Sequence, residues 1–404
     1  MSEFGKLWTA GTLSSLGDGV STAAGPLLAA TLTRDPVQIA GLMVAEQLPW
    51  TLLALPSGAV VDRVDRRRLL VVASLVRTVA LGSLGLAVAT GHVLLPVLYL
   101  VFLVAGCAGV LFENASVAIL PETVGRADLS RANGRMFASR SLGQALLGPP
   151  LAGWLFAIAL WTPFAVDAAV FVLVSALCLA LSATVVRAPV ARTTFRAAIA
   201  EGVRFLMGHR VLRATALMIS VENMVLGSVF SIMVLIARER LGLGPVGYGL
   251  LISASAVGGI LGGLVAGRVI GQIGAGTTIR AGLVVEALCN LGLAVTRAAW
   301  LAGAIIAVLG LHLVIFSTIN ATLRQSIAPP DMLGRVHSAY RLLSNGGMLT
   351  GAALGGLTAS YFGLTAPFWI GFVAVTALAC GSWRLLGQVT LTSPETGDIP
   401  PKYS

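Results

Sequence analysis

The feature that most constrains the fold of this chain is a series of long apolar segments that recurs from one end to the other. A helix needs about 20 mostly apolar residues to cross the hydrocarbon core of a bilayer. Hydrophobic residues make up 56% of the 404 residues and charged residues only 11%, and a soluble protein could not bury so much apolar surface. The sequence therefore predicts an all-α polytopic membrane protein. We expect twelve membrane-spanning helices, at roughly 7–33, 37–61, 69–90, 93–117, 136–160, 163–186, 212–237, 245–270, 279–297, 299–323, 335–360 and 364–386.

Lys and Arg are unevenly divided between the two sets of loops that these segments define. With the amino terminus in the cytoplasm, twenty of the 27 Lys and Arg residues fall in cytoplasmic stretches and four in outer loops. Cytoplasmic loops of membrane proteins carry such an excess. We therefore expect a multi-pass protein of the cell membrane with both termini in the cytoplasm. The same bias explains the net charge of +10, so we expect no nucleic-acid partner.

A long polar stretch divides the apolar segments into six and six. We expect a six-helix bundle at residues 1–186 and a second one at 212–386. The linker between them is expected at 187–211, and a cytoplasmic tail at 387–404. Apolar residues recur near helical spacing within the linker, at Phe195, Ile199, Val203 and Leu206. This pattern predicts an amphipathic helix on the inner membrane surface, and a flexible linker is the alternative.

The two halves repeat one another in sequence. At an offset of 203 residues, Ser141 aligns with Ser344, and Gly148 and Gly153 align with Gly351 and Gly356. Matches among glycines arise easily by chance in such a composition, but these share one offset and one topological position. We expect two pseudo-symmetric bundles with a substrate site between them near the membrane midplane.

The loop between the second and third segments carries a family resemblance. It is similar to the loop at this position in the major facilitator superfamily, whose pattern is Gly-x-x-x-Asp-Arg-x-Gly-Arg-Arg/Lys. The matching residues are Gly58, Asp62, Arg63, Arg66 and Arg67. Asp65 stands where the pattern has its second glycine, a variant that resembles the macrolide- and enterobactin-exporter branch. The resemblance implies the twelve-helix fold of that superfamily and transport by alternating access.

Asp62 is the expected gating residue of this loop. A helix amino terminus carries about half a positive charge and free N–H groups, and we expect Asp62 to dock near the start of the eleventh segment, around Gly334 to Val336. Such a contact would lock the halves together on the inside. We expect Arg66 to Arg68 to hold anionic lipid or loop acids.

A second motif lies in the fifth segment, between Gly143 and Gly153. It resembles the antiporter motif of superfamily exporters, with the core Gly-Pro-x-x-Gly-Gly. Gly148, Pro149 and Gly153 match this core, and Ala152 replaces one of its glycines. The partial match favours export over import, although small residues at this spacing also serve simple close packing of helices.

Ionisable residues inside a membrane are costly, so each is a functional hypothesis. Asp18 and Glu222 lie at similar depths in the first and seventh segments, and Glu46 lies midway along the second. A carboxyl group removed from water favours its protonated form. We therefore expect these acids to couple protons to substrate, with His312 in the tenth segment as a possible relay. The alternative is that each merely hydrogen-bonds a neighbour.

Other intramembrane charges are expected to form structural pairs. Glu113 can pair with Arg77 or Arg140, and Glu286 with Arg341, because a buried charge is tolerated when an opposite charge faces it. Asp167 lies near the outer end of its segment, where we expect water to reach it.

These features predict a secondary transporter rather than an enzyme. No Walker motif, nucleophile elbow or metal-ligand spacing is visible in the sequence, so we expect no metal and no cofactor, with a proton gradient as the driving force. The favoured function is proton-coupled export of a hydrophobic, drug-like small molecule or secondary metabolite by a monomer in the bilayer. Expected cavity residues are aromatic or Met side chains: Phe102, Phe112, Met218, Met224, Phe230 and Phe316. Uptake or facilitated diffusion of a nutrient is one alternative, and a non-transporting assembly factor or receptor is another.

Overall fold

The computed structural model describes residues 2–53, 56–125, 128–182, 195–329 and 332–387, and in these residues every regular element is helical. The first half of the chain contains α1 (Glu3–Leu32), α2 (Pro36–Leu52), α3 (Pro56–Arg63), α4 (Arg66–Ala89), α5 (Leu95–Thr123), α6 (Leu129–Arg140), the π-helix η2 (Ser141–Leu147), α7 (Gly148–Ile158) and α8 (Thr162–Leu179). The second half contains α10 (Arg210–Phe230), α11 (Met233–Leu235), the π-helix η3 (Ile236–Arg240), α12 (Pro245–Ile273), α13 (Ala275–Val295), α14 (Ala299–Ile327), α15 (Leu333–Phe362) and α16 (Ala366–Leu386).

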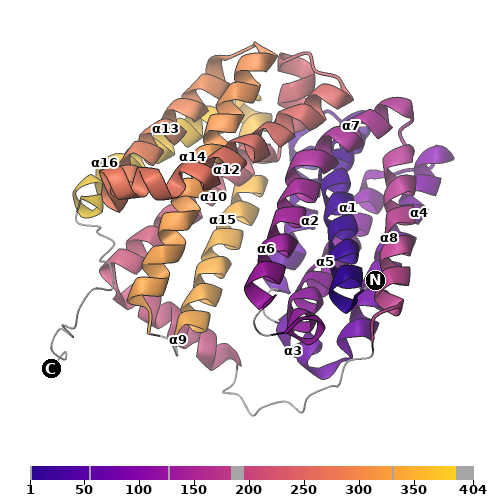
Figure 1. Ribbon diagram of the computed structural model, residues 1–404. Coiled ribbons are helices and arrows are strands. Elements are labelled where there is room, and N and C mark those ends of the chain that lie inside the picture. Colours follow the sequence, from indigo (N-terminus) through magenta and orange to yellow (C-terminus); the bar gives the residue numbers. More distant parts are fainter. Residues whose placement is uncertain (1, 54–55, 126–127, 183–194, 330–331, 388–404) are drawn as a thin grey trace.

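The helix α9 (Phe195–Gly208) connects the halves, which lie side by side in Figure 1. It lies within the predicted linker, and its Glu201 forms an ion pair with Arg335 in the first turn of α15. We call the end of the bundle that carries α3 and α9 the α9 end, and the other the opposite end. The predicted tail at 387–404 and the linker residues up to 194 lie outside the described residues, apart from Gly387.

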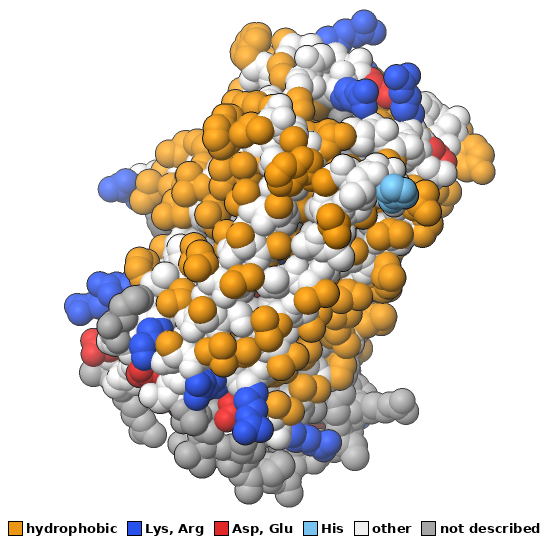
Figure 2. Space-filling view, turned by 90° about the vertical axis from the view of Figure 1, so that its right-hand side faces the viewer, with side chains coloured by type: hydrophobic (Ala, Val, Ile, Leu, Met, Phe, Trp, Pro, Cys, Tyr) orange, Lys and Arg blue, Asp and Glu red, His pale blue; other side chains and the backbone are white. Residues whose placement is uncertain are grey.

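Nine helical stretches among the described residues are long and apolar enough to cross a membrane by length and composition. They do not include α1, α2 or α15, so the count of twelve stays a prediction. Large apolar side chains point outward, such as Val79, Leu264 and Trp300 with exposed fractions of 69%, 71% and 75%. Figure 2 shows hydrophobic side chains over the middle of one face and charged side chains mainly toward its two ends. This arrangement suits a bilayer rather than water.

The second and fifth predicted segments each correspond to more than one observed helix. The second segment, expected over 37–61, contains α2, which ends at Leu52, and α3, which begins at Pro56, and residues 54–55 between them lie outside the described residues. The fifth segment was expected to begin at 136, but α6 begins at Leu129 and is more polar than a lipid-facing helix. The sequence rule for apolar length therefore missed the polar extension at the start of the fifth segment.

The halves contact each other mainly through two helix pairs: α2 with α15, and α7 and η2 with α12. Small residues bring these backbones together. A methyl group on Gly153 would meet the carbonyl of Pro245, and one on Gly249 would meet that of Pro149. Arg238, which follows α11, also donates a hydrogen bond of 2.6 Å to the carbonyl of Ala30 at the end of α1. These contacts close the opposite end, whereas α3 and α6 make no comparable packing with the second half.

This asymmetry predicts where the halves can be cross-linked. A methyl group on Gly356 would lie 2.6 Å from Cβ of Ala40, and disulfides join Cβ atoms about 3.5–4.5 Å apart, so a small separation of α2 and α15 suffices. The exposed Cys380 is first replaced by serine. In this background we expect the pair Ala40→Cys and Gly356→Cys to form a disulfide in most molecules. The disulfide is measured as loss of maleimide labelling.

The matched control joins the same two regions at the α9 end. Arg63 and Gly334 are both exposed, and the pair Arg63→Cys with Gly334→Cys is expected to cross-link at least about tenfold more slowly, a free-energy difference of about 1.4 kcal/mol. Faster cross-linking of the control pair would mean that the protein rests with the α9 end closed.

Candidate functional site

A cavity of about 210 Å³ lies in the first half, among α1, α2, α5 and α6. Its walls combine aromatic and Met side chains with charged groups, among them Asp18, Trp50, Phe112, Glu113, Met136 and Arg140. Of the aromatic and Met residues expected from the sequence, Phe112 lines this cavity, whereas Phe102 and Met218 are buried in the hydrophobic core. The cavity therefore offers apolar surface and fixed charge together, as a site for an amphipathic small molecule does.

Asp18 forms an ion pair with Arg77, which is only 4% exposed. Ser14 lies one turn before Asp18 on the same face of α1, and its hydroxyl accepts a hydrogen bond of 3.2 Å from the same guanidinium. The guanidinium also lies 3.8 Å from the ring centroid of Phe171 on α8. Arg77 therefore pairs with Asp18 rather than with Glu113, and the Asp18 carboxylate lies between the cavity and a buried cation.

Asp167 is buried on the inner side of α8, with an exposed fraction of 1%. One of its oxygens accepts a hydrogen bond of 2.6 Å from the hydroxyl of Ser21, and the other has no hydrogen-bond partner. The expectation of a hydrated residue was wrong, because α8 packs this part of its length against α1. Asp167 and Asp18 both lie close enough to Arg77 for their charges to interact.

Glu113 and Arg140 form an ion pair, which is one of the two pairings that the sequence allowed. Arg140 also donates a hydrogen bond of 3.3 Å from Nε to the amide oxygen of Gln144. We expected this pair to be buried. Instead, the side chains of Glu113 and Arg140 are 31% and 43% exposed, and both line the cavity. They are therefore available to a bound molecule.

Glu46 on α2 is the acid of this region that lacks a cation. Its carboxylate has no ion pair or hydrogen bond with the residues the structure describes. It is close enough to interact electrostatically with Asp18 and with Tyr248 of α12. Glu46 thus lies between the cavity of the first half and a helix of the second.

A second cluster lies in the second half and joins Glu222 of α10, Glu286 of α13 and His312 of α14. One ligand-type atom from each lies within 4.8 Å of the others, and all three side chains are buried. The predicted pair of Glu286 with Arg341 was wrong, because Glu286 faces this cluster and Arg341 is exposed. Sequence analysis named the three residues individually but did not predict that they meet, since they are far apart in the chain and no two have ligand spacing.

The two sequence motifs occupy contact positions between helices. A methyl group on Gly148 would collide with the backbone of Gly19 on α1, and Gly153 and Pro149 lie in the close packing with α12. In the loop before α4, Arg66 binds Glu122 and the carbonyl of Ala118.

The other members of that loop do not form a common site in the structure. Arg67 donates to the carbonyl of Leu179, while Gly58 and Arg63 are exposed. The side chain of Asp62 lies outside the described residues, so its docking stays a prediction.

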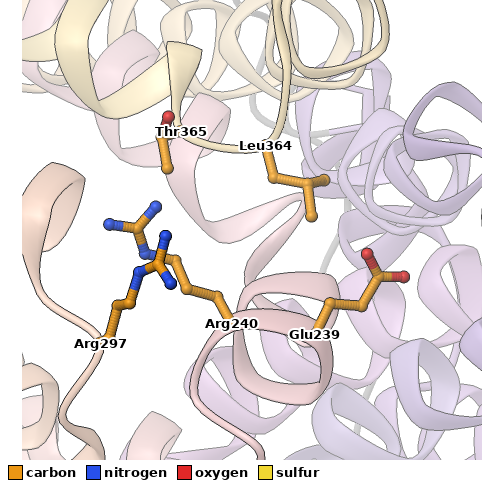
Figure 3. Close-up of a pocket in the computed structure, with 5 residues that line it drawn as sticks. All are labelled: Glu239, Arg240, Arg297, Leu364 and Thr365. Atoms are coloured by element: carbon orange, nitrogen blue, oxygen red, sulfur yellow. The ribbon is translucent and has the colours of Figure 1, made fainter.

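A further pocket of about 420 Å³ lies at the opposite end and is lined by Glu239, Arg240, Arg297, Leu364 and Thr365 (Figure 3). Arg240 donates hydrogen bonds of 2.8 and 2.6 Å to the carbonyls of Thr296 and Ala294. A cation at the carboxyl end of a helix stabilises its dipole and free carbonyls. Arg240 therefore caps α13, and this pocket lacks the acids of the two inner clusters.

Comparison with known proteins gives consistent matches along the chain. Residues 1–393 match the family model MFS_3, described as transmembrane secretion effector. The chain is 26% identical over 404 residues to the uncharacterized MFS-type transporter YfiS of Bacillus subtilis, covering 94% of this chain and 90% of the relative. It is 28% identical over 314 residues to the enterobactin exporter EntS of Salmonella typhimurium, covering 75% and 72%.

Solved structures share the fold at low sequence identity. A bacterial homologue of the human lysosomal transporter Spinster, in an inward-facing and occupied conformation, has a TM-score of 0.76 at 14% identity and covers 97% of this chain and 98% of its own. The nucleoside transporter NupG has a TM-score of 0.74 at 13% identity and covers 96% and 100%. At these identities the likeness concerns the fold alone.

Proposed function

Because the chain belongs to the MFS_3 family of the major facilitator superfamily, we propose that this secondary transporter exports a partly apolar small molecule in exchange for protons. The observation that carries the proposal is the cavity of the first half, where Trp50, Phe112 and Met136 share the wall with paired charges. Aromatic and Met side chains adapt to varied apolar surfaces. A sugar or a simple ion would leave most of this wall without a partner.

Support for export comes from the way in which the cavity is closed. Contacts of Gly153 and Gly249 close the opposite end, while α3 and α6 remain apart from the second half at the α9 end. We propose that the α9 end faces the cytoplasm, in agreement with the excess of Lys and Arg in the loops assigned to that side. The site then loads from the cytoplasm, as an exporter requires. The similarity to EntS, itself an enterobactin exporter, supports the same direction.

Proton coupling needs an acid that can gain and lose a proton during the cycle. Asp18 and Glu113 each form an ion pair with a guanidinium, whereas Glu46 forms none within the described ranges of the chain. We therefore assign the coupling role in the first half to Glu46, and we assign Asp18 to holding Arg77. Glu222 and His312 lie in the separate cluster of the second half.

The test is proton movement in vesicles reconstituted with purified protein and loaded with a pH-sensitive dye. Lipophilic cations and macrolide-like compounds are added on the α9 side, and we expect at least one class to drive proton flux several-fold above protein-free vesicles. Empty vesicles control for passive entry of weak bases. Substrate movement without proton flux would refute proton coupling. If none of the compounds moves across the membrane and none drives proton flux, export of this substrate class would be refuted.

A further inference from the structure

Three side chains that can bind metal meet in the core of the second half. Glu222, Glu286 and His312 come from α10, α13 and α14, and their exposed fractions are 2%, 2% and 5%. Their ligand atoms lie within 4.8 Å of one another. The cavity described above lies in the first half, so this cluster is a separate site.

The cluster lacks partners within the described part of the chain. Both oxygens of Glu222, Oε2 of Glu286 and Nε2 of His312 are buried without a hydrogen-bond partner. No described Lys or Arg forms an ion pair with either carboxylate. Buried polar groups without partners are unfavourable, and more so when they are charged. Four such atoms on three neighbouring side chains indicate that something else satisfies them.

The backbone makes room for this grouping. Gly282 lies one turn before Glu286 on the same face of α13, and a methyl group there would collide with the ring of His312. The imidazole therefore lies over Gly282 and reaches Glu286, while its ring stacks on Phe316 with centroids 5.9 Å apart. Asn290, on the next turn of α13, donates its amide to the carbonyl of Glu286. The site is thus held by packing on both sides of the ring.

The separation of the atoms fits metal ligands better than a hydrogen bond. Nε2 of His312 and Oε2 of Glu286 are 3.4 Å apart, longer than the usual 2.7–3.2 Å of an N–H···O bond. Two ligands at about 2.0–2.1 Å from a tetrahedral metal lie about 3.3 Å apart. A ligand oxygen of Glu222 lies within 4.8 Å of both other ligand atoms, so this carboxylate is placed to supply the third ligand, and water can supply a fourth.

We propose that Glu222, Glu286 and His312 bind one divalent transition-metal cation inside the second half. Two carboxylates and one dication carry no net charge together, which makes the loaded site compatible with a low-dielectric core. A nitrogen and two carboxylate oxygens form a ligand set that suits Zn²⁺ or Mn²⁺. This inference is independent of the proposed export function, because it concerns different residues and needs no transported substrate.

The experiment measures metal on the purified, full-length protein. The protein carries an affinity tag without histidine, is stripped with chelator in detergent, is loaded with Zn²⁺ or Mn²⁺, desalted, and analysed by elemental mass spectrometry. We expect about one equivalent per chain, falling at least about tenfold in Glu286→Gln and in His312→Asn, because each change removes a ligand. Gly282→Leu keeps all three ligands but displaces the imidazole, and it is expected to weaken retention as well.

The matched control is Asp167→Asn, which changes a buried acid of the first half and should retain the full equivalent. Size-exclusion chromatography and circular dichroism establish that each variant is folded before its metal content is compared. A parent protein that retains neither metal above the level of Glu286→Gln would overturn the proposal. Equal retention by all variants would also overturn it, since binding would then come from surface groups.

Discussion

Replacing Asp18 by asparagine is expected to lower the melting temperature of the protein by roughly 5 °C, because about 3 kcal/mol is lost. The substitution removes the carboxylate that faces Arg77, whose side chain is 4% exposed. Ser14 and Phe171 still contact the guanidinium but carry no charge. Asp167 also lies close enough to Arg77 for their charges to interact, but it forms no ion pair with Arg77 that would replace the one lost. Asp18 is 35% exposed to the cavity, which places the expected loss at the low end of the range for buried pairs.

A double substitution separates the ion pair from general damage to α1. Asp18→Asn combined with Arg77→Met removes both charges and keeps an apolar side chain against Phe171, so we expect at least half of the lost melting temperature to return. Asp128→Asn is the control, since Asp128 is exposed and makes no side-chain bond to α6. A double variant no more stable than Asp18→Asn would show that the pair does not hold α1 to α4.

The sequence predicted the class of fold because apolar length is a strong signal in membrane proteins. Segment positions, the division into halves and the superfamily followed from it and from the loop around Gly58. The early start of α6 was missed because its first turns, such as those around Arg131 and Arg135, are polar and were read as loop.

The partners of the intramembrane charges could not be predicted in the same way. A helix surrounded by lipid and protein is apolar on every side, so its sequence carries little periodicity to show which face points inward. Depth along the helix singled out Asp18 and Glu222 in the sequence, and their coupling role stays a prediction. Rotation about the helix axis decides that Arg77 meets Asp18 and that Glu286 meets His312, and only the packed structure contains that information.

Replacing Glu46 by glutamine is expected to reduce substrate-driven proton flux at least about tenfold, which equals 1.4 kcal/mol or more in the coupled step. Glutamine keeps the size and hydrogen-bonding atoms of the side chain but cannot take up a proton. The assignment rests on two observations: no Lys or Arg among the described residues forms an ion pair with Glu46, and Glu46 lies close enough to Asp18 and Tyr248 to interact electrostatically with both. A residue between the two halves can sense their relative movement, whereas Asp18 is held by Arg77 within one half.

The measurement uses dye-loaded vesicles together with equilibrium binding of the same compound to detergent-solubilised protein. We expect binding of Glu46→Gln to stay within about threefold of the parent, a difference near 0.6 kcal/mol, because Glu46 does not line the cavity. Glu239→Gln makes the same chemical change at an exposed site of the opposite end and should leave both readouts unchanged. Parent-like proton flux in Glu46→Gln would move the coupling role to another acid. Loss of binding together with flux would instead make Glu46 a substrate contact, since a residue that only carries protons leaves the empty cavity able to bind.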